Sequence, residues 1–130
     1  MSSKSRIQRL RESLDQCGLD AILVSGAENR RYLSGFTGSF GYLIVSFTDA
    51  IIVTDFRYME QAIQQSPEFR VERVSGKSDW LPRFADEMGV KKMGFETRYL
   101  TVADRSGFQK AIDEYFQRET LFLIDVVDVV

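Results

Sequence analysis

The chain has 130 residues, the length of one ordinary domain, and we expect a single domain over residues 1–130. Apolar residues make up 44% and charged residues 28% of it, the balance of a globular protein with a buried core. The formal net charge is -2 and no basic tract occurs, which argues against a nucleic-acid partner. No apolar stretch nears the length of a membrane span and no signal peptide opens the chain, so we expect a cytoplasmic protein without a membrane partner.

Helical spacing, capping residues and β-rich runs predict four helices and six strands that mostly alternate. In chain order these are a helix ending at residue 18, strands over 20–25, 42–47 and 50–55, a helix over 56–66, a strand over 69–74, a helix over 78–89, a strand over 91–96, a helix over 102–116 and a strand over 121–130. The segment 27–34 is ambiguous, with a helical turn as one interpretation. Asp55 and Thr101 are candidate caps of the helices that follow them.

The two strands on either side of Thr48-Asp49 predict a β-hairpin. Elsewhere strands and helices mostly alternate, and helical crossovers favour parallel pairing. The element order therefore predicts an α/β fold: a three-layer domain with a mixed, mainly parallel β-sheet containing one antiparallel hairpin.

The chain lacks histidine and contains one cysteine, Cys17. Without histidine it cannot form an ordinary catalytic triad, an imidazole base or a histidine-containing metal site. Its carboxylates fall at expected turns or on helix faces, where solvated and capping roles are typical. We therefore expect no catalytic residue, no metal ligand and no cofactor in this chain. Cys17 continues the helical spacing of Ile7, Leu10 and Leu14, which predicts a buried cysteine.

Residues 34–41 read SGFTGSFG and place Gly35, Gly38 and Gly41 three residues apart. A dinucleotide site needs G-x-G-x-x-G between a strand and a helix, whereas a strand follows here, which argues against a nucleotide. Glycine also permits positive φ and close approach of other groups. The surrounding rings either pack on the sheet or line a recognition surface, and both interpretations are open for Tyr32, Phe36, Phe40 and Tyr42.

The stretches NRRYLSGFTGSFGYLIV and AIIVTDFRYMEQA resemble the amino-terminal domain of the creatinase, prolidase and Xaa-Pro aminopeptidase family. Members of this family typically carry N-x-R-Y-L-S/T-G-F-T-G-S, then a hairpin, then T-D-x-R-Y. The matching positions are Asn29, Arg31, Tyr32, Leu33, Ser34, Gly35, Phe36, Thr37, Gly38, Ser39, Thr54, Asp55, Arg57 and Tyr58. A late GFE stretch, Gly94 to Glu96, follows in the expected order, and Phe56 stands where glycine is more usual.

This resemblance implies a creatinase/prolidase N-terminal fold and a larger catalytic domain of pita-bread fold that is absent from this chain. In the peptidases that domain holds two divalent metal ions, such as Mn or Co. An apolar strand that stops at Val129-Val130 also suggests a piece of a longer protein. The expected parent is a metal-dependent hydrolase, a Xaa-Pro dipeptidase (prolidase) or an aminopeptidase P, and this fragment alone is expected to be inactive. The alternative is a protein-binding module of a catalytically inactive peptidase-like protein.

The family's amino-terminal domain contributes to oligomer contacts and overhangs the active site, where it limits substrate length. The resemblance thereby implies three partners: the chain's own C-terminal catalytic domain, further copies in a homodimer or higher oligomer, and a proline-containing peptide. The candidates for substrate contact are Phe36, Phe40, Tyr42, Arg57 and Tyr58. For Arg57 a structural ion pair with Asp55 or Glu60 is an equal alternative.

Overall fold

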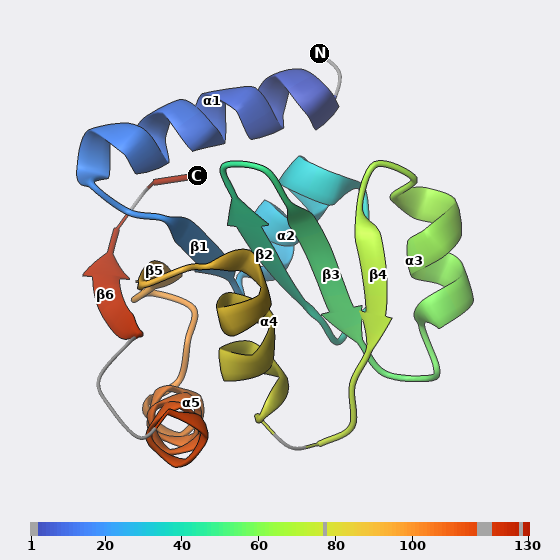
Figure 1. Ribbon diagram of the computed structural model, residues 1–130. Helices are drawn as coiled ribbons and strands as arrows, with labels where there is room; N and C mark the ends of the chain where they lie inside the picture. The colour runs from blue at the N-terminus through green and yellow to red at the C-terminus, as the bar shows by residue number, and fades with distance from the viewer. Residues whose placement is uncertain (1–2, 77, 117–120, 128) are drawn as a thin grey trace.

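A six-stranded β-sheet forms the centre of the chain (Figure 1). The computed structural model describes residues 3–76, 78–116, 121–127 and 129–130. Across the sheet the strands are ordered β4-β3-β2-β1-β5-β6. Their bounds are Ala21–Val24 (β1), Tyr42–Ser46 (β2), Ala50–Thr54 (β3), Arg70–Arg73 (β4), Lys92–Glu96 (β5) and Phe122–Val126 (β6).

Among the strands in the described residues, only β2 runs against the others. It is antiparallel to both β1 and β3, whereas β1–β5, β5–β6 and β3–β4 are parallel pairs. The pair β2–β3 is the expected hairpin, and Ser46 N–H donates to the Asp49 carbonyl at its turn, at 2.9 Å. The parallel strands end at one edge of the sheet, which we call the carboxyl edge.

Helices cover both faces of this sheet. Their bounds are Ser3–Cys17 (α1), Ala27–Ser34 (α2), Met59–Gln65 (α3), Trp80–Met88 (α4) and Val102–Tyr115 (α5). Buried side chains of α1, α2 and α3 form the core on one face, and those of α4 and α5 form the core on the other. The expected three-layer α/β domain with a mixed, mainly parallel sheet and one hairpin is confirmed. Within the described residues, no helix is long and apolar enough to cross a membrane.

Strand β1 supplies side chains to both cores because successive residues of a strand point to opposite faces. Ile22 and Val24 pack with α1–α3, whereas Ala21 and Leu23 pack with α4 and α5. A strand that is buried on both faces carries an almost continuous apolar run. That pattern is why the sequence indicated this strand so clearly.

The ambiguous segment 27–34 is helix α2. It ends because Gly35 takes a left-handed conformation, with φ of 81°, and its N–H donates to the Arg31 carbonyl at 2.8 Å. This conformation is readily available to glycine and strained for most other residues. The first glycine of the loop is therefore a helix terminator.

Two of the expected element ends differ from the structure. Asp55 does not cap α3, which begins at Met59, because its carboxylate accepts the Arg57 N–H at 2.9 Å within a tight turn. The last strand ends at Val126 and not at residue 130, and residue 128 lies outside the described residues. Thr101 caps α5 as expected, accepting the Asp104 N–H at 3.0 Å.

Cys17 is exposed, so the expectation of a buried cysteine is wrong. Helix α1 ends in a Schellman motif: Gly18 N–H donates to the Asp15 carbonyl at 3.1 Å and Leu19 N–H to the Leu14 carbonyl at 2.9 Å. This turn brings Leu19 back over Leu14, and Leu19 is 3% exposed. The core position that helical spacing assigned to Cys17 is thus filled by the residue after the helix.

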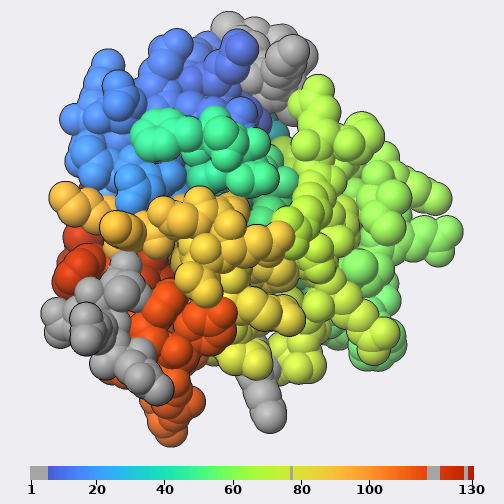
Figure 2. Space-filling model, viewed as in Figure 1, coloured from blue at the N-terminus to red at the C-terminus, as the bar shows by residue number. Residues whose placement is uncertain are grey.

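Helix α1 is also tied to the hairpin. The Arg11 guanidinium donates from Nε to the Ser46 carbonyl at 2.7 Å and from Nη2 to the Asp49 carbonyl at 3.2 Å. Figure 2 shows the hairpin turn lying directly beside the amino-terminal helix. Helix α1, which packs on one face of the sheet, is therefore also fixed to the hairpin turn at the end opposite the carboxyl edge.

Replacing Leu19 by alanine tests the assignment of the core position after α1. We expect Leu19→Ala to lower the free energy of unfolding by about 2–5 kcal/mol, because it empties a packed apolar site. The matched variant Cys17→Ala is expected to change it by less than about 0.5 kcal/mol. Urea unfolding followed by circular dichroism measures both, and a larger loss for Cys17→Ala would contradict the assignment.

Candidate functional site

The candidate residues lie at the carboxyl edge. The glycine loop, residues 35–41, connects α2 to the start of β2, and Tyr42 of β2 pairs with Val53 near the end of β3. The turn over residues 55–58 follows β3 at the same edge. In open α/β sheets this edge is where ligands usually bind. The structure thus brings the two halves of the sequence motif together.

The glycine loop is wrapped around the ring of Phe36. Phe36 is 1% exposed, and a Cβ atom placed on Gly38 would lie 2.3 Å from its Cζ atom. Gly38 is therefore needed because a ring lies against its backbone. Phe36, one of the five candidates, is a core residue in this conformation and has almost no surface to offer a substrate.

Hydrogen bonds from α3 hold the outer half of the loop. Thr37 N–H donates to Gln65 Oε1 at 2.9 Å, and the side-chain amides of Gln61 and Gln65 each donate to Thr37 Oγ1 at 3.0 Å. The hydroxyls of Ser39 and Tyr58 are hydrogen-bonded to each other. These contacts fix the loop to α3 and to the turn before it.

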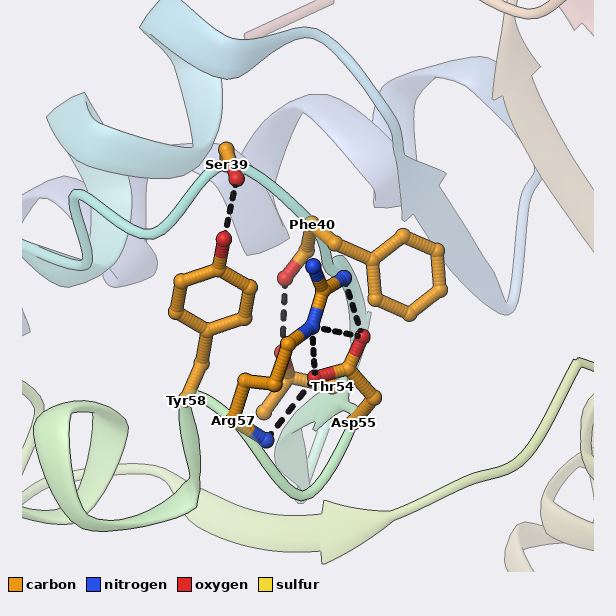
Figure 3. Close-up of polar contacts among 6 residues, drawn as sticks. All are labelled: Ser39, Phe40, Thr54, Asp55, Arg57 and Tyr58. Carbon is orange, nitrogen blue, oxygen red and sulfur yellow. Dashed lines mark hydrogen bonds and ion pairs between the residues drawn. The ribbon is translucent and has the colours of Figure 1, made fainter.

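Thr54, the last residue of β3, adds a contact beneath the loop. Its Oγ1 donates to the Phe40 carbonyl at 2.6 Å (Figure 3). Figure 3 also shows the ring of Phe40 pointing away from Tyr58, with Arg57 between the two. The five candidates therefore do not form one cluster.

Phe40 and Tyr42 belong to the α4–α5 face. Their ring centroids are 6.0 Å apart, and the Tyr42 ring lies 5.4 Å from Trp80 and 5.6 Å from Phe108. Both candidates are partly buried and pack against this core. Burial raises the pKa of the Tyr42 hydroxyl, and the Asp104 carboxylate raises it further. Tyr42 is therefore neutral at physiological pH, and the pair offers ring edges, not charge.

Tyr58 and Phe36 pack together on the opposite face. Their centroids are 6.3 Å apart in an edge-to-face arrangement. Tyr58 is partly buried in the core of α1–α3, and its hydroxyl reaches the loop. Its described contacts give it a role in supporting the loop.

Arg57 forms an ion pair with Asp55. Its Nη2 lies 2.7 Å and its Nε 3.2 Å from Asp55 Oδ2, while Nε also lies 3.2 Å from Oδ1. The hydrogen-bonded guanidinium lowers the pKa of Asp55, and the carboxylate raises the pKa of Arg57. The guanidinium also lies over the Tyr58 ring, with 5.1 Å to the centroid. Of the two alternatives for Arg57, the structural ion pair is thus present, with Asp55 as the partner.

Sequence reasoning missed a buried polar junction at the start of α2. Glu96, 6% exposed, accepts the N–H groups of Ser25 and Gly26 at 2.8 and 2.9 Å and the Asn29 side-chain amide at 2.5 Å. It therefore caps α2 from the distant strand β5. Asn29 and Glu96 both lie in the stretches that carry the family resemblance, and this was the only signal available for them.

Arg30 connects the same junction to the glycine loop. It is 7% exposed and donates from Nη1 to the Ser25 carbonyl at 2.8 Å and from Nη2 to the Gly38 carbonyl at 3.3 Å. Burial lowers the pKa of this guanidinium, an effect that the Glu96 charge opposes. Arg30 follows no apolar spacing, so nothing in the sequence marked it as buried.

The described residues contain no group of three histidine, cysteine, aspartate or glutamate side chains that could hold a metal ion. Two carboxylates of the carboxyl edge already have partners: Asp55 is paired with Arg57, and Glu96 accepts backbone and amide N–H groups. The two divalent ions implied by the resemblance therefore do not fit this part of the chain.

Residues 6–126 match the family model described as the Creatinase/Prolidase N-terminal domain. The chain belongs to this family. The resemblance drawn from the two motifs is confirmed, and the match to the family model covers nearly the whole chain. An uncharacterized peptidase, YqhT of Bacillus subtilis (strain 168), is 32% identical over 110 residues, which are 84% of this chain and 31% of that protein.

Solved structures agree with this Creatinase/Prolidase N-terminal domain. The Xaa-Pro dipeptidase from Bacillus anthracis has a TM-score of 0.89 and 32% identity, covering 98% of this chain and 34% of its own. The N-terminal domain of the cytoplasmic peptidase PepQ from Mycobacterium tuberculosis H37Rv has a TM-score of 0.86 and 35% identity, covering 96% and 95%. The chain thus spans about a third of YqhT and of the Bacillus anthracis dipeptidase, and nearly all of the PepQ N-terminal domain.

Replacing Gly38 by alanine tests the close approach of the Phe36 ring. We expect Gly38→Ala to lower the free energy of unfolding of this domain by about 1–3 kcal/mol, because the ring must move out of a packed site. The control is Gly76→Ala, where a Cβ meets nothing within 4 Å, and we expect a change below about 1 kcal/mol. Equal urea midpoints for the two variants would show that the ring does not constrain the loop.

The Asp55–Arg57 pair predicts a pH dependence. Because its folded-state pKa lies below the ordinary 3.8, Asp55 stabilises the fold above that pH, and the contribution is lost as pH falls through the folded pKa. The difference in unfolding free energy between the domain and Asp55→Asn should therefore shrink towards acidic pH. Carboxyl-detected NMR titration checks the cause: Arg57→Met should raise the pKa of Asp55 towards 3.8, and an unchanged pKa would contradict the pairing.

Proposed function

We propose that this domain is the non-catalytic N-terminal part of a metal-dependent Xaa-Pro peptidase, an aminopeptidase P or a prolidase, and that it contributes to substrate access and oligomerisation. Its similarity to a Xaa-Pro dipeptidase over 98% of the chain supports the peptidase class. The absence of a metal-binding group among the described residues supports a division of labour between domains. Hydrolysis before proline is then metal-ion chemistry of a C-terminal catalytic domain, and Mn and Co are candidate metals.

The observation that carries the role in substrate access is the rigid presentation of Phe40. Its carbonyl is bound by Thr54, its ring contacts Tyr42, and the residue before it is held by Tyr58. A half-buried ring fixed in this way loses little conformational entropy when a ligand packs on it. Aromatic faces and edges are good partners for a proline ring, which is apolar and rigid. Phe40 and Tyr42 would therefore bound the space in which a proline-containing peptide lies.

Tyr58 and the ion-paired Arg57 have a different part in this proposal. Tyr58 supports the glycine loop from the turn that precedes α3, and Arg57 stiffens that turn. The domain would hold its position over the reaction through its own catalytic domain and through a second copy in a dimer or higher oligomer. These contacts would exclude long substrates and water without supplying a reacting group.

Substitution of Phe40 in the full-length peptidase tests the proposal. We expect Phe40→Ala to raise KM for a proline-containing tripeptide about two- to tenfold, the effect of losing one ring contact, with kcat little changed. Phe47→Ala is the matched control, because this exposed ring lies on the hairpin turn at the opposite end of the sheet. Steady-state kinetics at saturating metal measures both variants, and urea midpoints check that both are folded.

Three outcomes would contradict this function. An unchanged KM in a folded Phe40→Ala enzyme would show that the Phe40 ring does not contact the substrate. Cleavage of the same tripeptide by the 130-residue chain alone would overturn the division of labour. A full-length protein that lacks peptidase activity with any divalent metal would favour the alternative, a protein-binding module of a catalytically inactive relative.

A further inference from the structure

Arg57 and Arg73 both lie at the carboxyl edge, but their charges differ in availability. Arg57 is held by Asp55 through three contacts of 3.2 Å or less, so a ligand carboxylate would have to displace a local partner. Arg73, the last residue of β4, is exposed and has no ion pair with any carboxylate of the described residues. Of these two arginines, Arg73 is therefore the one whose charge is free to meet an anionic ligand.

The pairing of β3 with β4 brings Arg73 to the candidate site. Arg73 is the register partner of Thr54, and Val74 N–H donates to the Thr54 carbonyl at 2.9 Å. Thr54 in turn holds the Phe40 carbonyl. Because side chains alternate along β4, Arg73 lies on the face of Val71, which packs with α1–α3, and Glu72 lies on the other face. The neighbouring Glu72 is engaged by Arg70 at 2.7 Å.

Phe56 lies next to Arg73 and contacts its guanidinium. Its ring is 69% exposed, and the Arg73 guanidinium lies over it with 5.9 Å to the centroid. A cation held over an aromatic face keeps its outward N–H groups free while its position is restricted. An exposed ring of this size beside an unpaired arginine is also the composition of recognition hot spots.

We propose that Phe56 and Arg73 form a subsite for the free C-terminal carboxylate of a peptide. The planar guanidinium binds the carboxylate through two parallel N–H···O bonds, and the exposed ring packs on the last side chain of the peptide. The subsite lies at the carboxyl edge beside Thr54, which binds the Phe40 carbonyl. It deepens and rests on the proposed function by naming the end of the peptide that is recognised.

The probe is a pair of peptides that differ only at the C-terminus: acetyl-Ala-Pro-Phe as the free acid and as the amide. We would titrate each into the ¹⁵N-labelled chain up to about 10 mM, because one exposed subsite is expected to bind in the millimolar range. The free acid should shift the Arg73 Nε–H and the Phe56 amide with an affinity about two- to fivefold higher than that of the amide, the ordinary size of an exposed ion pair.

Two variants identify the cation responsible. Arg73→Met should abolish the preference for the acid, and Phe56→Leu should weaken both peptides. Arg57→Met tests the other arginine of the edge and should keep the preference for the acid, although its ion pair with Asp55 stiffens the turn that carries Phe56. Urea midpoints establish that each variant is folded, and added salt should reduce the preference because the site is exposed.

The outcomes separate this proposal from the function on which it rests. If acid and amide bind equally and both shift Phe40 and Tyr42, the peptide contact stands and the carboxylate subsite is wrong. If Arg57→Met removes the preference and Arg73→Met keeps it, the subsite belongs to Arg57 and this assignment is overturned. If neither peptide shifts any residue of the carboxyl edge, both proposals fail for the domain.

Discussion

One reversed strand decides where the candidate site lies. Strand β2 is antiparallel to both of its neighbours, so the connection from β1 begins and ends at the same edge of the sheet. Helix α2 and the glycine loop are therefore not a crossover to the far end. They overhang the carboxyl edge. The turn after β3 lies at this edge too, because β3 ends there. Had β2 run parallel, the loop would lie at the opposite end, beside α1.

The overhang is held by buried polar contacts as well as by apolar packing. Glu96 caps α2 from β5, and Arg30 joins the start of that helix to the Gly38 carbonyl. Buried charges of this kind are costly unless their hydrogen bonds are made, so they tolerate few alternative geometries. Much of the family motif has this architectural role: Asn29 binds Glu96, and Thr54 binds the Phe40 carbonyl. A loop fixed at so many points can present a ring in one position.

The two arginines of the carboxyl edge differ in their contacts. The motif residue Arg57 is committed to Asp55, whereas Arg73, which no motif marks, is left to interact with Phe56. Residues that match a family pattern can thus be the ones that build a site. Residues that vary within the pattern, such as Phe56 in place of a more usual glycine, are then free to differ in what they bind.

The sequence alone determined the α/β class, the hairpin, most helices and strands, and the family, because each follows from local spacing, turn chemistry or a contiguous motif. It also named the residues of the glycine loop. Only the tertiary structure decided which of them are accessible: Phe36 turns inward because the backbone of Gly38 leaves room for its ring, and Leu19 replaces Cys17 because a Schellman turn folds it back. The contacts of Glu96, Arg30 and Arg73 likewise join elements far apart in the chain. No local pattern encodes such contacts, since they depend on strand order and on which face each side chain takes.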